Sequence, residues 1–189
     1  MTGARLFELI ERIGTLLRAE LRKSAAKVGG QPVHLQVLGY LAQCNRYSNT
    51  PAGVTAYLGI TKGTASQSLG VLERKGLVNK VPDIKDRRVV HLHLTEQGQR
   101  LLQGTWLPAL WAGAGLGLEE RQWTLTEQAL EQILRNVQRR HRYQTFGPCL
   151  TCRHLQQESS EQFRCGLTQE LLQASETAKI CHEHAFPQA

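Results

Sequence analysis

Residues 50–94 read TPAGVTAYLGITKGTASQSLGVLERKGLVNKVPDIKDRRVVHLHL. Thr50 is a typical N-cap residue followed by proline at the first helical position, which predicts a short helix over 51–58. Gly59 allows a tight turn into a second helix over about 62–75, which another threonine caps. Two small helices joined by a tight glycine turn are typical of a helix-turn-helix.

A β-hairpin is predicted directly after the second helix. Two short apolar segments, 77–81 and 89–94, flank the charged stretch 82–88. His91 and His93 alternate with apolar residues at the strand period of two. The pattern therefore predicts a two-stranded ribbon with a long, charged tip.

Amphipathic helices flank this unit on both sides. Apolar residues recur at three- and four-residue steps over 4–27, and a second helix is expected from Pro32 to near Arg46. Further helices are expected over 96–111 and 118–143. The predicted fold is mainly α with a small β-hairpin wing, a winged helix-turn-helix with long N- and C-terminal dimerisation helices.

Charge divides the chain into two parts. Of the 23 basic and 16 acidic residues among 189, the last 41 residues carry three and five, so the first 148 carry a net +9. We expect a basic body over 1–143, with its winged helix at about 32–102, and a separate tail over 144–189. A basic body favours a polyanionic partner.

The sequence argues against membrane insertion and secretion. It has no run of about 18 apolar residues. Glu8 and Glu11 interrupt the stretch where a signal peptide needs apolar residues. We therefore expect a cytoplasmic protein, and structural disulfides are rare there.

The candidate DNA-contacting residues lie on the second helix of the helix-turn-helix and on the hairpin. Short polar donors and a lysine near a helix N-terminus can reach base edges or phosphates in the major groove. On the helix they are Lys62, Thr64, Ser66, Gln67 and Ser68. Basic residues at the helix end and the hairpin tip complete the set, namely Arg74, Lys85, Arg87 and Arg88. Ala65, Leu69 and Leu72 are left to face the core.

The motifs LERKGLV at 72–78, DIKDRR at 83–88 and LHLTEQG at 92–98 resemble the MarR family of bacterial transcription regulators. The likeness is clear over about 33–102, and the flanking helices agree in order and length. The resemblance implies that Asp86 holds the wing by pairing with an arginine, with Arg88 as first choice. It also implies that Arg87 or Arg88 enters a minor groove, where narrow A·T-rich DNA attracts arginine.

The resemblance also implies a homodimer, formed by the N-terminal helix and the two late helices. A two-fold dimer places two reading helices about one turn of DNA apart, so it would read a pseudo-palindromic operator. The family often binds small aromatic compounds near its dimer interface, so an effector of that kind is expected.

Four of the five cysteines lie in the tail. Their spacing is Cys149-x2-Cys152-x12-Cys165-x15-Cys181. The tight turn of a C-x2-C lets both thiolates face one ion. We expect a short helix over 166–172 between the last two cysteines. Cys44 lies at the end of an apolar helix and is interpreted as a core residue.

Four cysteines suffice for tetrahedral zinc or for an iron–sulfur cluster. The second pair, Cys165 and Cys181, is not a C-x2-C. This spacing departs from the paired knuckles of a zinc ribbon and favours the iron–sulfur cluster. A redox disulfide stays open as well, and His154, His182 or His184 could replace one cysteine as a ligand. A site attached to the dimerisation helices could alter the spacing of the reading helices when it is occupied or oxidised.

These patterns predict a dimeric, sequence-specific DNA-binding transcription regulator, a repressor tuned by metal or a cluster on its tail. One alternative is a regulator that responds to redox change or a small aromatic compound and carries a purely structural zinc. Another is an architectural protein that binds nucleic acid without sequence preference. No nucleophile with a general base and no phosphate-binding glycine loop can be identified, so an enzyme is not expected.

Overall fold

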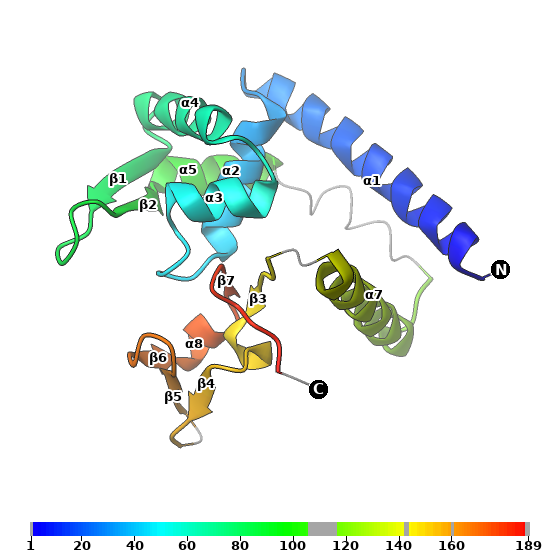
Figure 1. The fold of residues 1–189 in the computed structure, drawn as a ribbon. Helices are drawn as coiled ribbons and strands as arrows, with labels where there is room; N and C mark the ends of the chain where they lie inside the picture. The colour runs from blue at the N-terminus through cyan, green and yellow to red at the C-terminus, as the bar shows by residue number, and fades with distance from the viewer. Residues whose placement is uncertain (1, 106–116, 142–143, 160, 188–189) are drawn as a thin grey trace.

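The structure is a computed structural model, and it describes residues 2–105, 117–141, 144–159 and 161–187. Its N-terminal half runs α1 (Thr2–Lys27), α2 (Pro32–Gln43), α3 (Pro51–Leu58), α4 (Lys62–Arg74), β1 (Val78–Pro82), β2 (Val90–Leu94) and α5 (Glu96–Thr105). A long helix, α7 (Glu120–His141), follows (Figure 1). The predicted fold class, helices with a small β-hairpin wing, is confirmed.

Local caps and turns make the helix-turn-helix. The Thr50 hydroxyl accepts a hydrogen bond from the Gly53 N–H, and the Thr61 hydroxyl accepts one from the Thr64 N–H, both at 3.1 Å. Gly59 adopts a left-handed conformation with φ of 62°, which costs glycine little. The sequence signals therefore place α3 and α4 at the predicted residues.

The wing is an antiparallel ribbon in which Val78 pairs with Leu94 and Pro82 pairs with Val90. Val78 and Leu92 turn inward and are buried. They join one core that α1, α2, α3, α4 and α5 share. Its largest fully buried apolar side chains are Leu35, Val37, Leu38, Tyr40, Val54, Leu69, Leu72, Val78 and Leu92.

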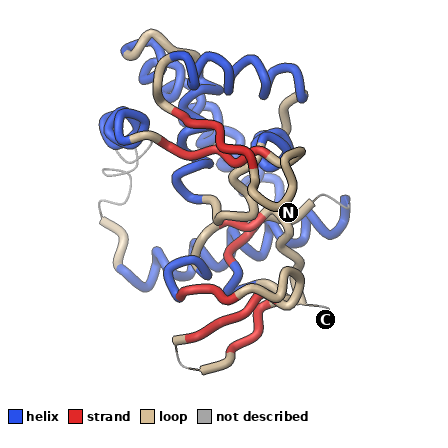
Figure 2. The backbone as a smooth tube through the Cα atoms, turned by 90° about the vertical axis from the view of Figure 1, so that its left-hand side faces the viewer, coloured by secondary structure: helices blue, strands red, loops and turns tan. Residues whose placement is uncertain are grey.

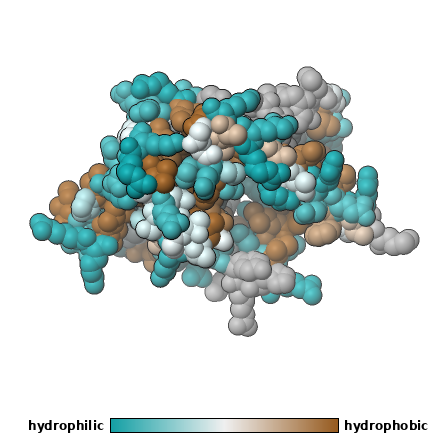
Figure 3. Space-filling model, turned by 90° about the horizontal axis from the view of Figure 1, so that it is seen from above, coloured by the Kyte–Doolittle hydropathy of each residue, from teal (hydrophilic) through white to brown (hydrophobic). Residues whose placement is uncertain are grey.

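The two long helices expose apolar side chains. On α1 these are Leu6, Phe7, Leu9, Ile10, Ile13 and Leu16, and on α7 they are Trp123, Leu125, Leu130, Leu134 and Val137. Figure 3, viewed from above, shows hydrophobic atoms open to solvent among hydrophilic ones. An exposed apolar surface of this extent on a single chain marks an interaction site.

The tail is built from short strands. They are β3 (Gly147–Pro148), β4 (Leu155–Gln157), β5 (Gln162–Cys165), β6 (Leu171–Gln173) and β7 (Ile180–Cys181), with the 3-10 turn η1 (Cys149–Thr151) and the short helix α8 (Ala174–Thr177) between them. β3 pairs with β7, and β4, β5 and β6 form a three-stranded sheet. Figures 1 and 2 both place the tail below the winged helix.

The end of one helix and the existence of another differ from the sequence-based prediction. Helix α2 ends at Gln43 rather than near Arg46, because Cys44 is extended and pairs with Ile180 of the tail. The helix expected over 166–172 is wrong. A turn there leads into β6, which pairs with β5 and buries the alternating Leu172.

The ends of the two late helices, predicted over 96–111 and 118–143, fall partly on residues 106–116 and 142–143, which lie outside the described residues. None of the helices in the described ranges combines the length and apolar content that crossing a bilayer requires.

Two helical glycines should respond oppositely to alanine. A Cβ at Gly53 would lie 2.3 Å from the Ser48 carbonyl oxygen and 2.7 Å from the Tyr40 hydroxyl, whereas at Gly70 its nearest neighbour is the flexible end of Arg74 at 3.5 Å. Gly53→Ala should lower the free energy of unfolding by about 1–3 kcal/mol. Gly70→Ala should raise it by about 0.5–1 kcal/mol. Urea denaturation of both variants tests this, and a Gly53→Ala protein at least as stable as Gly70→Ala would contradict it.

Candidate functional site

The exposed face of α4 carries most of the predicted DNA-contacting side chains. Lys62, Thr64, Ser66 and Gln67 are exposed. Ser68 is not, since only 5% of its surface is accessible, and it lies on the buried stripe with Leu69. Ser68 is therefore removed from the DNA-contacting set, because the 3.6-residue helical period turns it inward with the core residues.

Thr64 is bonded to the N-cap residue Thr61 through its side chain as well as through its backbone N–H. Its hydroxyl lies 2.9 Å from the Thr61 hydroxyl, which fixes the side chain at the first turn of α4. Arg74 is exposed at the other end of the helix. The candidate DNA-contacting surface thus begins at the N-terminus of α4, where free backbone N–H groups favour phosphate.

Two aspartates shape the tip of the wing. Asp83 accepts hydrogen bonds from the N–H groups of Lys85 and Asp86, both at 2.7 Å, and these bonds lower the pKa of Asp83. Asp86 pairs with the Arg88 guanidinium through bonds of 2.8–3.2 Å, which lower the pKa of Asp86. Arg87 is exposed beside this pair.

His91 links the wing to the loop between α2 and α3. Its Nδ1 lies 2.7 Å from Asn49 Oδ1, and its Nε2 lies 3.1 Å from Asp83 Oδ2. The Asn49 carbonyl also accepts the N–H of Leu92, at 2.7 Å. Sequence reasoning interpreted His91 as an ordinary strand residue, and no local signal marks a contact with a residue 42 positions away.

A hollow of about 710 Å³ joins the reading helix to the wing. It is lined by Lys62 and Ser66 of α4 and by Lys80 and Val90 of the wing strands. Two of the predicted residues, Lys62 and Ser66, therefore border one concave surface with the wing strands.

Residues 29–89 match the model of the MarR family. This segment of the winged helix is therefore similar to the MarR family. The matched segment holds α2, α3, α4 and the wing tip, so the resemblance carried by the wing motifs is confirmed there. No curated protein matches the chain at a significant level.

Three solved structures share the fold. The transcriptional regulator PA3341 is 27% identical, with a TM-score of 0.61 over 71% of this chain and 98% of its own. A MarR transcriptional regulator from Methanosarcina mazei Go1 is 22% identical, with a TM-score of 0.60 over 72% and 98%. S. aureus MepR, in a complex with DNA, is 21% identical, with a TM-score of 0.56 over 69% and 94%. All three are matched almost end to end, yet more than a quarter of this chain lies outside each match.

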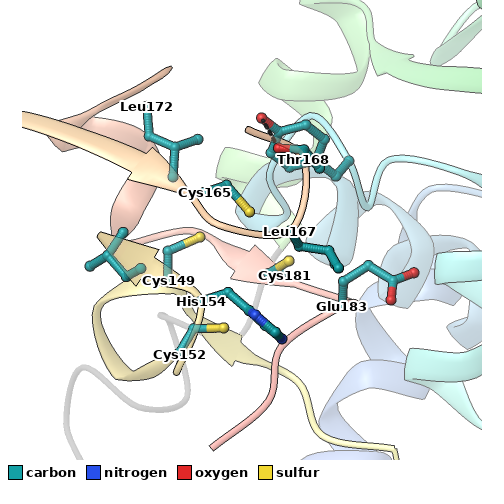
Figure 4. Close-up of a pocket in the computed structure, with 11 residues that line it drawn as sticks. Cys149, Cys152, His154, Cys165, Leu167, Thr168, Leu172, Cys181 and Glu183 are labelled. Atoms are coloured by element: carbon teal, nitrogen blue, oxygen red, sulfur yellow. Dashed lines mark hydrogen bonds between the residues drawn. The ribbon is translucent and has the colours of Figure 1, made fainter. Parts of the chain in front are cut away.

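Outside the segment that resembles the MarR family, the four tail cysteines line one cavity. Figure 4 shows the sulfurs of Cys149, Cys152, Cys165 and Cys181 turned toward the same space. The Cys152 N–H bonds to the Cys149 carbonyl at 2.9 Å, which closes the C-x2-C turn. Cys165 ends β5 and Cys181 ends β7. Cys149 and Cys181, 32 positions apart, thus meet because β3, which runs directly into the C-x2-C turn, pairs with β7.

The cavity contains a polarised pair of thiols. A hydrogen bond between Cys149 and Cys181 lowers the pKa of Cys181 and raises the pKa of Cys149. The side-chain amide of Asn45 acts on both sulfurs: it adds to the lowering of the pKa of Cys181 and only partly offsets the rise in the pKa of Cys149. Thiolates bind metals, so these contacts favour the ligating form at Cys181.

The tail histidines differ in position. His154 lines the cysteine cavity. His184 is buried elsewhere, with Nε2 3.1 Å from the Thr151 hydroxyl and Nδ1 3.1 Å from the Thr145 hydroxyl. His182 faces the hollow beside α4. Of the three, only His154 is therefore placed to replace a cysteine.

The thiol side chains are near one another but do not form a completed ligand set. In the described part of the chain, no three His, Cys, Asp or Glu side chains are arranged to hold a metal ion as they stand. A shared cavity shows that the sulfurs converge, whereas ligation requires them to come closer still. The predicted metal site therefore stays a prediction.

Cys44 should be chemically inert in the folded protein. It is 6% exposed in the main core, and burial raises its pKa to about 12. Almost no thiolate exists at pH 8 under these conditions, so iodoacetamide should leave Cys44 unmodified and should label it in urea. Peptide mapping by mass spectrometry reads each cysteine separately, and labelling at equal rates in both states would contradict the burial.

Proposed function

We propose that this protein is a dimeric, sequence-specific DNA-binding transcription regulator that acts as a repressor in the cytoplasm. The observation that carries the proposal is the concave surface shared by the N-terminal face of α4 and the wing, with Lys62 and Ser66 opposite Lys80. Such a surface suits a major groove read by α4 and a minor groove entered by the wing.

Charge within the wing supports a division of roles. Arg88 is committed to Asp86 and braces the tip, while Arg87 stands exposed next to it. Arg87 is therefore the side chain that we assign to the minor groove. Lys62 and Arg74, at the two ends of α4, are assigned to phosphates, and Ser66 and Gln67 to base edges.

The dimer is supported by the long helices. The apolar side chains exposed on α1 and α7 need a cover, and a second copy supplies one of matching character. Two reading helices related by a two-fold axis then require a pseudo-palindromic site.

Variants of α4 should separate specific from non-specific binding. The probe is a duplex selected from a random library by the protein itself. Gln67→Ala should weaken binding to it by about 1–3 kcal/mol and relax the preferred base at one position per half-site. Lys62→Ala should weaken binding to all duplexes alike and reduce the salt slope by about one.

Arg100→Ala is the matched control, since Arg100 is an exposed basic residue on α5 that pairs with Glu96. It should leave the affinity unchanged. If the wild-type protein binds selected and random duplexes equally well, sequence-specific regulation is excluded and an architectural role remains.

A second cavity favours a small aromatic effector. It measures about 230 Å³ and lies between the connection from α1 to α2, α2 itself, the end of α4 and α5. Leu35, Leu38, Leu72, Leu77 and Leu101 give it apolar walls, with His34 and Lys75 at its polar side. Burial and the charge of Lys75 lower the pKa of His34. A single aromatic ring with a carboxylate near Lys75 fits this lining.

We also propose a metal centre on Cys149, Cys152, Cys165 and Cys181 that tunes DNA affinity. Zinc or an iron–sulfur cluster can be held by four thiolates. The spacing in the sequence favours the cluster. The cavity volume of about 20 Å³ is room for about one water-sized atom and favours a single zinc ion. Zinc is therefore the metal that we place first.

Metal content decides between these forms. Protein purified without oxygen should contain one zinc per chain and no colour, and the Cys149→Ser and Cys165→Ser variants should each lose the metal. Iron with equimolar sulfide and a brown colour would instead establish a cluster. Cys44→Ser is the matched control, since its sulfur lies in the main core, and it should keep the metal. Protein free of any metal would contradict the site.

A further inference from the structure

The loop between α2 and α3 buries three polar side chains. Asn45 is 2% exposed, Ser48 is 0% exposed and Asn49 is 8% exposed. Buried polar groups need hydrogen-bond partners, because an unpaired one costs about 1–3 kcal/mol. Several partners of this loop come from the tail, more than 100 residues further along the chain.

Asn45 connects the loop to the cysteine cavity. Its Nδ2 donates to Cys149 Sγ at 3.9 Å, and its backbone N–H donates to the Ile180 carbonyl at 2.9 Å. Its Oδ1 accepts from the Ser48 hydroxyl at 2.7 Å and from the Tyr47 N–H at 3.2 Å. The amide thus holds a cysteine sulfur on one side and the loop on the other.

Ser48, three residues after Asn45, also bonds to the tail on one side and to the winged helix on the other. Its hydroxyl accepts the N–H of His182, which follows Cys181 directly, at 2.8 Å. Its carbonyl accepts the Tyr40 hydroxyl of α2 at 2.8 Å. Thr50, two residues on, caps α3. The backbone that follows Cys181 is therefore bonded to the segment that starts the helix-turn-helix.

Charged contacts continue the junction outside the buried network. Arg46 pairs with Glu170 at 3.3 Å and with Glu176 at 3.1 Å, and it donates to the Leu171 carbonyl at 2.7 Å. Glu170 also lies 3.7 Å from Lys85 at the wing tip. Gln144 and His182 of the tail line the same hollow as Lys62 and Ser66 of α4. The tail therefore touches the loop, the wing and the edge of the reading surface.

The tail has little apolar core of its own. In its described residues the buried core members are Cys149, Leu172 and Cys181, so two of the three are cysteines. A core this small seldom holds a fold without a metal or other crosslink. The order of the tail should then depend on what the four thiolates hold.

We propose that the loop from Cys44 to Asn49 transmits the state of the cysteine site to the DNA-reading surface. With metal bound, the ordered tail supplies the bonds that Asn45 and Ser48 need and fixes the start of α3 and the wing. Without metal, these groups lose their partners, and the operator is bound more weakly. The inference rests on the proposed function and names its route of regulation.

This route differs from the one expected from the sequence, which ran through the dimerisation helices. The contacts of the described tail with the loop and the wing are the basis for the change. Between α7 and the described tail, Arg139 donates a hydrogen bond to the Pro187 carbonyl at 3.4 Å, and the Arg135 guanidinium lies 4.6 Å from the centre of the Phe186 ring.

The experiment measures a coupling ratio, the operator Kd after chelation divided by the Kd with Zn²⁺ bound. The operator is the duplex selected from a random library, and the full chain is used under a thiol reductant. For the wild-type protein the ratio should be at least about ten, which corresponds to about 1.4 kcal/mol of coupling.

Arg46→Gln should lower this ratio at least about threefold while zinc affinity, read by competition with a chromophoric chelator, stays unchanged. Arg164→Gln is the matched control, because Arg164 makes equivalent contacts with Glu158 and Gln169 inside the tail. It should keep the wild-type ratio. Ser48→Ala is a second variant that cuts the buried network itself, and it should bring the ratio close to one.

Each remaining outcome overturns a stated part. A wild-type ratio of one with intact operator preference overturns the coupling and leaves the regulator in place. If Arg46→Gln and Ser48→Ala both keep the wild-type coupling ratio, the route through the loop is overturned. Absence of zinc uptake overturns the inference together with the metal site. Absence of any operator preference overturns the proposed function instead, whatever the ratio.

Discussion

The hydrogen bond from the Tyr40 hydroxyl to the Ser48 carbonyl sets the geometry on which the DNA-reading half depends. It joins the end of α2 to the loop that leads into α3. Gly53 packs against the same carbonyl so closely that no Cβ fits between them. Because Thr50 begins α3 between these two contacts, the direction of the helix-turn-helix follows from them. The wing is held to the same loop through Asn49 and His91.

Local chemistry explains why much of this unit could be predicted from the sequence. Thr50, Gly59 and Thr61 act through bonds and backbone angles within a few residues, so their positions alone predict α3 and α4. The alternation around Leu92 predicts a strand for the same reason. Ser68 was assigned wrongly because its polar side chain suggested exposure, whereas its position in the helical period turns it inward.

Long-range contacts explain what could not be predicted. The early end of α2 depends on Cys44 pairing with Ile180, and the strand that replaces a helix near Leu172 depends on β5. The cysteine spacing predicted that four sulfurs could meet, and they do line one cavity. It could not predict that Asn45 would reach that cavity, since nothing near Asn45 in the sequence refers to a residue 104 positions later.

The junction between tail and loop also has a consequence for the order of synthesis. The Ser48 hydroxyl accepts a hydrogen bond from the backbone N–H of His182, 134 residues later in the chain. A ribosome therefore adds 134 residues after Ser48 before this loop can close. The nascent winged helix can collapse early around its own leucines, but its last buried bonds form only after His182 has been synthesised. A chain cut short before Cys181 retains every DNA-contacting residue and still lacks the groups that complete the loop, so premature termination yields a product with its reading surface unfinished.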